Sequence, residues 1–118
     1  MRTRHFKSAA AIVIALANCN LTASAAGSEQ ALLSKGEALL RDNCNRCHSV
    51  GKTDASAHAK APAFRDVILR YPPENLAEAL AEGIVSGHPD MPVLSFDADD
   101  IDAMIAYLNT LNGRAITP

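Results

Sequence analysis

Cys44-Asn45-Arg46-Cys47-His48 is the stretch that decides the fold of this 118-residue chain. Immediately before it, residues 29–43 repeat apolar and small side chains at the spacing of an α-helix, at Leu32, Gly36, Leu39 and Leu40. Ser28 stands where a residue would cap the first turn of such a helix. The sequence therefore predicts a helix over 29–43 that leads directly into Cys44.

The spacing of the two thiols has a specific chemical use. Cys-x-x-Cys-His is the pattern for covalent attachment of c-type haem. Two thiols three positions apart can reach the two vinyl groups on one edge of a porphyrin, and the next residue directs an imidazole nitrogen at the iron. The motif therefore predicts one covalently attached haem c on Cys44 and Cys47, with His48 as a ligand of the iron.

Two other kinds of site use a Cys-x-x-Cys pair. A thioredoxin-like redox motif lies near a strand in a βαβ unit, but this pair follows a helix in a chain with no convincing strand. A structural zinc site needs four ligands, which the two thiols together with His48, His58 or His88 could supply. Both alternatives stay open at this point, although the motif favours haem.

The middle of the chain is predicted to be a loop followed by two short helices. Residues 49–61 are polar and rich in alanine without a clear period, which indicates an irregular loop. Helices are expected over 64–71 and from Pro73 to about residue 83. They are separated at Pro72-Pro73, because the residue before a proline avoids helical geometry and a proline suits the first position of a helix.

The C-terminal part of the chain combines a loop with a final helix. Residues 87–92 contain two prolines and a short polar segment, so an ordered loop or a turn is predicted there. Asp97 and the acidic residues after it suit the positive end of a helix dipole, and Gly113 is well positioned to end that helix. The predicted fold class is all-α, with about four short helices.

The first 25 residues have the pattern of a secretory signal peptide. Basic residues at the start precede an uncharged run over 9–16, and small residues follow at 22–25. The run is too short for a transmembrane anchor, which needs about 20 apolar residues. We therefore expect cleavage after Ala25, a domain over 26–118 and a periplasmic location.

Cys19 offers an alternative processing route. Leu16-Ala17-Asn18-Cys19 faintly resembles the lipobox of bacterial lipoproteins, in which a cysteine becomes the lipidated first residue. Asn18 departs from the small residue expected at its position. Loss of Cys19 with the signal peptide is therefore favoured over lipid anchoring.

Removal of the expected signal peptide makes the chain acidic. Residues 26–118 hold 8 Lys and Arg against 13 Asp and Glu, a net charge of −5. Nucleic acid would need a basic face, so this composition argues against it as a partner. A protein with a basic docking surface fits the charge better.

These features together resemble the class I cytochromes c, in particular the small bacterial periplasmic monohaem type, over nearly all of residues 26–118. The resemblance implies the cytochrome c fold around one covalently bound haem. In that family a glycine of the first helix packs against an aromatic residue of the last, and Gly36 and Tyr107 match these positions. Pro62 matches a proline whose carbonyl accepts a hydrogen bond from the ligating histidine; this would fix the tautomer of His48 and raise the basicity of its ligating nitrogen.

The resemblance also implies the sixth ligand of the iron. The family takes a methionine sulfur from a proline-bordered loop ahead of the last helix, and Met91-Pro92 matches that position. Met104 lies on the apolar stripe of the last helix, so it is assigned to packing. His88 stays an alternative ligand because imidazole also binds haem iron, and His58 is a weaker alternative.

Two axial side chains would leave no coordination position open for a substrate, so the resemblance implies a one-electron carrier and not an enzyme. Its donor and acceptor would be redox proteins that bind through small interfaces. Two other functions stay open: a haem-bearing electron-transfer subunit of a periplasmic dehydrogenase complex, and a ligand-binding or peroxidase-like haem protein if the methionine ligand is labile. Arg65, Arg70 and Lys52 are expected to pair with the haem propionates or to be solvated surface charges.

Overall fold

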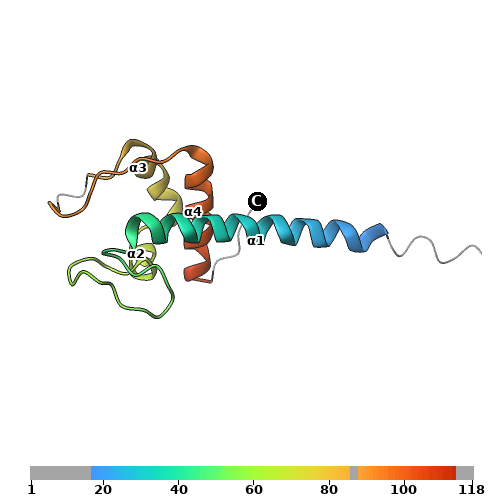
Figure 1. The fold of residues 1–118 in the computed structure, drawn as a ribbon, viewed down its shortest axis with the longest axis horizontal. Coiled ribbons are helices and arrows are strands. Elements are labelled where there is room, and N and C mark those ends of the chain that lie inside the picture. The colour runs from blue at the N-terminus through green and yellow to red at the C-terminus, as the bar shows by residue number, and fades with distance from the viewer. Residues whose placement is uncertain (1–16, 86–87, 114–118) are drawn as a thin grey trace, which may run out of the picture. The chain divides into compact units, whose positions relative to one another are not determined.

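The structure is a computed structural model of the 118-residue chain and describes residues 17–85 and 88–113. The chain divides into two compact units, residues 1–30 and 31–118. Helix α1 contributes to both units, and the other helices belong to the second (Figure 1). Residues 1–16 of the predicted signal peptide lie outside the described residues, so cleavage after Ala25 stays a prediction.

Helix α1 begins earlier than the sequence pattern predicts. It runs over Ala17–Cys44, where a helix over 29–43 with Ser28 as its cap was expected. Ser28 instead lies inside α1, and its hydroxyl donates a hydrogen bond to the carbonyl oxygen of Ala25 at 2.8 Å. The alanines that precede Ser28 explain the difference, because alanine has the highest helix propensity of all residues.

Helices α1 and α4 (Ala98–Leu111) meet at Gly36 (Figure 1). A Cβ atom on Gly36 would fall on the carbonyl oxygen of Ala103, so only glycine allows the two backbones to come this close. Lys35 Nζ also contacts Asp100 Oδ1 at 2.7 Å, and this hydrogen bond raises the pKa of Lys35. Because the two helices lie this close together, the side chain of Leu40, which is 1% exposed, is buried in the core.

The closest approach to Gly36 is made by the backbone of α4, and the packing of Tyr107 against Gly36 that the family resemblance implied stays a prediction. The atoms nearest to a Cβ on Gly36 belong to the backbone of Ala103 and Met104. Tyr107 lies one turn further along α4, and its hydroxyl donates a hydrogen bond to the carbonyl oxygen of Val50 at 3.2 Å. The glycine therefore accommodates a backbone, and the tyrosine fastens the loop that follows His48.

The predicted break at Pro72-Pro73 is present. Helix α2 (Phe64–Arg70) ends before it, and a 3₁₀ turn η1 (Pro73–Leu76) leads into α3 (Ala77–Glu82). One continuous helix was expected after the break; the 3₁₀ start is common at a helix N-terminus. Gly83 ends α3 with φ of +98°, a conformation that side chains with a Cβ rarely adopt.

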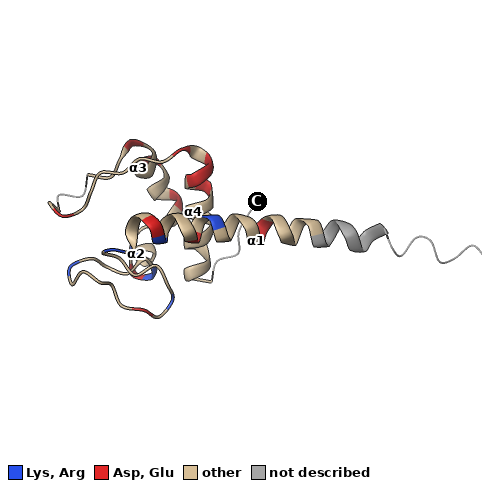
Figure 2. Cartoon of the chain, viewed as in Figure 1, with Lys and Arg blue, Asp and Glu red and all other residues tan. Residues whose placement is uncertain are grey.

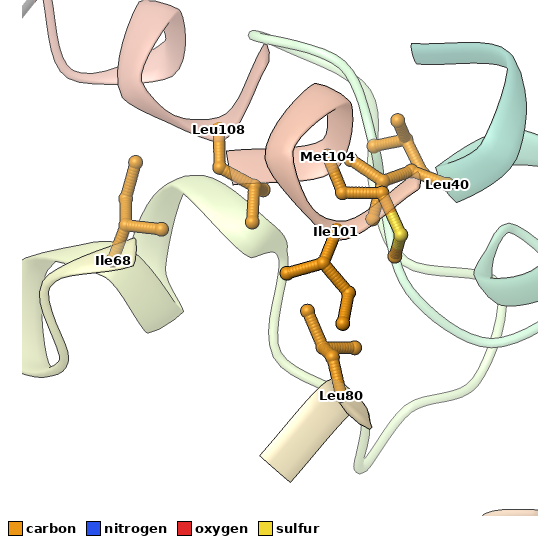
Figure 3. Close-up of a cluster of buried hydrophobic side chains, with 7 residues drawn as sticks. Leu40, Ile68, Leu80, Ile101, Met104 and Leu108 are labelled. Atoms are coloured by element: carbon orange, nitrogen blue, oxygen red, sulfur yellow. The ribbon is translucent and has the colours of Figure 1, made fainter. Parts of the chain in front are cut away.

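Helix α4 is the element on which the others pack. Asp97 caps it, since its Oδ1 accepts a hydrogen bond from Asp100 N at 2.9 Å. Near its end Gly113 adopts φ of +73°. Helices α2, η1 and α3 all contact α4. Buried apolar side chains from five segments meet there in one core (Figure 3): Leu40, Val50, Ile68, Leu80, Ile101, Met104 and Leu108.

The described part of the chain contains helices as its only regular elements, which confirms the all-α prediction. Met104 is 0% exposed, in agreement with its assignment to packing. Within the residues that are described, none of the helices has the length and apolar character needed to cross a bilayer.

Candidate haem-binding site

The two cysteines and His48 lie on one tight turn at the end of α1. Cys44 is the last residue of the helix, and its carbonyl oxygen accepts hydrogen bonds from Cys47 N at 3.1 Å and His48 N at 2.9 Å. Both thiols are free and half-buried. Burial raises the pKa of the Cys44 thiol from 9.0 to about 11, so the group is protonated at neutral pH.

His48 has a fixed ring orientation. Its Nδ1 lies 2.7 Å from the carbonyl oxygen of Pro62, the bond that the family resemblance implied. A carbonyl oxygen can only accept a hydrogen bond, so Nδ1 carries the proton and Nε2 keeps its lone pair. The ring is thus held in the tautomer that an iron ligand needs.

Phe64 adds a second constraint that sequence reasoning missed. Its ring stacks on the imidazole of His48, with centroids 5.2 Å apart and planes inclined by 27°. Phe64 was assigned only as the first residue of a helix, a position that α2 confirms. Its proximity to Pro62 was the one available hint, because a residue close to a histidine's hydrogen-bond partner can also reach the ring.

The loop between His48 and Pro62 is ordered by its own hydrogen bonds. The amide of His58 donates to the carbonyl oxygen of Cys47 at 3.1 Å, which folds the loop back onto the motif. Arg65 Nη1 reaches into the same loop through three hydrogen bonds. Arg70 and Lys52, the other two residues considered as propionate partners, are exposed.

Met91 lies in a loop that is fastened at its base to α3. The amide of Phe96 donates to the carbonyl oxygen of Leu80 at 3.0 Å. A Cβ on Gly83 would lie 2.7 Å from Val93 Cγ1, so Val93 of the loop also lies close to the end of α3. Met91 is half-buried, and its amide donates to the carbonyl oxygen of His88 at 3.2 Å in a turn.

A contact between His58 and Asp90 joins the loop that follows His48 to the loop that bears Met91. His58 Nε2 lies 3.9 Å from Asp90 Oδ2, and Asp90 precedes Met91. His58 Nδ1 accepts a hydrogen bond from Lys60 N at 3.2 Å, so its Nε2 carries a proton toward the carboxylate. His88 is exposed. The structure thus brings the segment beside Met91 to the Cys-x-x-Cys-His side, and the ligand role of Met91 stays a prediction.

The zinc alternative finds no support in the described ranges. Within residues 17–85 and 88–113, no group of three or more His, Cys, Asp or Glu side chains is close enough to hold a metal ion. A structural zinc site would need four such ligands.

A comparison with known protein families shows to which family the chain belongs. Residues 31–108, more than half of the chain, match the family described as cytochrome c oxidase, cbb3-type, subunit III. The chain belongs to this cytochrome c family. The match includes both cysteines, His48 and Met91. No curated protein and no solved structure matches the chain.

Membership of a cytochrome c family implies covalently bound haem c, and the residues of the motif fit that group. Two reduced thiols at positions i and i+3 are available for thioether bonds, and His48 presents a free Nε2 lone pair. Phe64 stacks on His48, and other partly buried apolar side chains, such as Ile84 and Phe96, pack against the core. The donor set of this site therefore suits a porphyrin iron.

Proposed function

We propose that this protein is a periplasmic monohaem c-type cytochrome that carries one electron at a time between redox partners. The observation that carries the proposal is the hydrogen bond of 2.7 Å between His48 Nδ1 and Pro62 O, next to two free thiols. It prepares an imidazole ligand beside the attachment cysteines in a chain of a cytochrome c family.

Four residues of the chain would bind the haem and its iron. Cys44 and Cys47 would tether the haem covalently, and His48 and Met91 would hold its iron. When bound, the haem supplies an iron that changes between two oxidation states. Methionine together with histidine raises the reduction potential relative to other ligand sets. Phe64 and Pro62 keep the His48 ring from reorienting, so electron transfer proceeds with little rearrangement.

The absorption spectrum of the purified mature protein, oxidised and reduced, tests this function. Covalent haem with His48 and Met91 ligation is expected to give sharp reduced bands and, in the oxidised form, the weak long-wavelength band of sulfur ligation. Mass spectrometry should detect one haem and an N-terminus at residue 26. Haem bands without the sulfur band would contradict Met91 as a ligand, and absence of haem would contradict the function itself.

Beyond α1, which carries charges of both signs, acidic and basic residues lie in different parts of the described chain (Figure 2). Residues 71–113 contain eight Asp and Glu and no Lys or Arg, whereas residues 46–70 contain five Lys and Arg and two Asp and Glu. The acidic region covers η1, α3 and the first turn of α4. This separation supports docking of a partner with a basic surface on the acidic region, because opposite charges steer the encounter.

Neutralising part of the acidic region should slow the reaction with a positively charged redox partner. Glu78 and Glu82 of α3 are exposed. In the double variant Glu78→Gln/Glu82→Gln, we expect reduction of the holoprotein by a hexaammineruthenium cation to slow about threefold to tenfold at low salt. Stopped-flow measurements over a range of ionic strength would show the difference shrinking as salt screens the charges.

Asp42→Asn/Asp66→Asn is the matched control, since it removes the same net charge from exposed residues outside the acidic region. If both double variants slow equally, net charge alone controls the rate, and docking on the acidic region is wrong. The anion hexacyanoferrate should react faster with the Glu78→Gln/Glu82→Gln variant than with the unmodified protein.

A second candidate function is a haem-bearing subunit of a membrane-associated or periplasmic redox complex. The description of the matching family supports it, because that family is named for a subunit of an oxidase. Co-purification of the untagged partner with this chain at a fixed ratio would favour the complex. A chain that elutes as a free monomer under the same conditions would favour the carrier.

A further inference from the structure

The loop that follows His48 is closed at its base by hydrogen bonds on neighbouring residues. His48 Nδ1 donates to Pro62 O at 2.7 Å, and Phe64 N donates to Ser49 O at 3.0 Å. Arg65 Nη1 donates to Ser49 Oγ at 3.0 Å. The two ends of the loop are therefore fastened side by side, and the position of the Pro62 carbonyl depends on this fastening.

Arg65, in the first turn of α2, makes more hydrogen bonds to this loop than any other described side chain outside it. Besides Ser49 Oγ, its Nη1 donates to Gly51 O at 3.2 Å and to Asp54 O at 2.8 Å. Bonds from a charged donor are stronger than those between neutral groups. Ser49 is 1% exposed, so without Arg65 its hydroxyl would lose its partner in a place that water does not reach.

We propose that Arg65 is a positioning residue for His48. By holding residues 49–54 against the first turn of α2, it keeps the Pro62 carbonyl on Nδ1 and the Phe64 ring against the imidazole. This inference rests on the proposed function, since it concerns His48 as an iron ligand. It assigns Arg65 a structural role within the chain, whereas its sequence position suggested a haem propionate or solvent as its partner.

The positioning effect and the charge of Arg65 shift the reduction potential in opposite directions. The Nδ1 hydrogen bond makes Nε2 a stronger donor, which favours oxidised iron and lowers the potential. Loosening that bond should therefore raise the potential. Loss of a nearby positive charge favours the oxidised state as well and should lower it. The sign of the change thus separates the two effects.

The test uses the holoprotein and four variants: Arg65→Met, Ser49→Ala, the double variant, and Arg70→Met as the matched control. Arg70 is an exposed arginine of the same helix, so its loss removes an equal charge without touching the loop. We expect a higher potential for Arg65→Met than for Arg70→Met, and a raised potential for the neutral change Ser49→Ala. The double variant should resemble Arg65→Met alone, because the two residues act through one bond.

Proton NMR of the reduced holoprotein gives a direct readout of the hydrogen bond. Solvent exchange of the His48 Nδ1 proton should be about tenfold faster or more in Arg65→Met, and faster in Ser49→Ala, than in Arg70→Met. Equal potentials and equal exchange rates in Arg65→Met and Arg70→Met would overturn the inference. If Arg65→Met does not fold, Ser49→Ala decides alone: an unchanged exchange rate there contradicts the positioning role.

The outcomes for this inference and for the proposed function are distinguishable. Absence of haem from the unmodified protein would contradict the function. Normal haem spectra in all variants, with the exchange rate of the His48 proton unchanged, would leave the function intact and overturn only the role of Arg65.

Discussion

Met91→Ala is expected to lower the reduction potential of the holoprotein by about 100 mV or more, within the roughly 0.8 V range over which axial ligands act. It should also abolish the weak long-wavelength band of the oxidised form. Thioether sulfur stabilises reduced iron more than water or a second imidazole does, so its loss favours the oxidised state. Potentiometric titration followed by absorption measures both effects on one sample.

Met104→Leu is the matched control for Met91→Ala. Met104 is 0% exposed in the core of α4, and a change to leucine nearly conserves its volume. The potential and the sulfur band should be retained in this variant. If Met91→Ala also keeps the reduction potential and the sulfur band of the unmodified protein, Met91 is not the sixth ligand, and His88→Ala becomes the next variant to measure.

Rapid binding of carbon monoxide by the reduced, unmodified protein at neutral pH would point to a different function. It would require an open or labile sixth position, as in a ligand-binding or peroxidase-like haem protein. Because Met91 sits in a loop fastened to α3 at Leu80 and Gly83, we expect carbon monoxide binding to be slow in the unmodified protein and fast in Met91→Ala.

Gly36→Ala should destabilise the holoprotein by about 3 kcal/mol, the upper end of the range for overpacking. The added methyl group would fall on the carbonyl oxygen of Ala103, and both partners belong to helix backbones that cannot turn aside as a side chain can. This is a large share of the total stability of about 5–15 kcal/mol that is typical of a domain. Urea unfolding followed by far-ultraviolet circular dichroism measures the loss.

Gly27→Ala serves as the control for this substitution. Gly27 also belongs to α1, but a Cβ there meets nothing within 4 Å. Alanine is the better helix former, so the stability should stay the same or rise by up to about 1 kcal/mol. Equal losses of unfolding free energy in the two variants would show that the glycine residue itself, and not the contact with α4, determines the stability at residue 36.

Much of the secondary structure followed from local signals. The break at Pro72-Pro73, the loop around Met91 and the acidic start of α4 near Asp97 were all predictable, because proline geometry and the helix dipole depend on a few neighbouring residues. The start of α1 was predicted incorrectly. Ser28 has the chemistry of a cap, but the alanines before it continue the helix.

Contacts between distant residues account for the other differences. The close approach of the Ala103 backbone to Gly36 was not predicted. Phe64 stacks on a histidine 16 positions earlier, and Arg65 binds Ser49 at the same separation. No local sequence pattern predicts such pairs. They depend on the angle between packed helices and on the path of a loop between them.

The sequence by itself determined the chemistry that we predict for this protein: Cys44, Cys47 and His48 have the identities and the spacing that covalent attachment of haem needs. It also determined the all-α class, through the period of its apolar residues. The Pro62 carbonyl was predicted as the partner of His48 from the family resemblance, and the structure contains that hydrogen bond. Only the tertiary structure decided that the Phe64 ring stacks on His48 and that the Arg65 guanidinium binds its loop. These contacts form because α2 packs on α4, and packing of this kind depends on the whole core and not on any one segment.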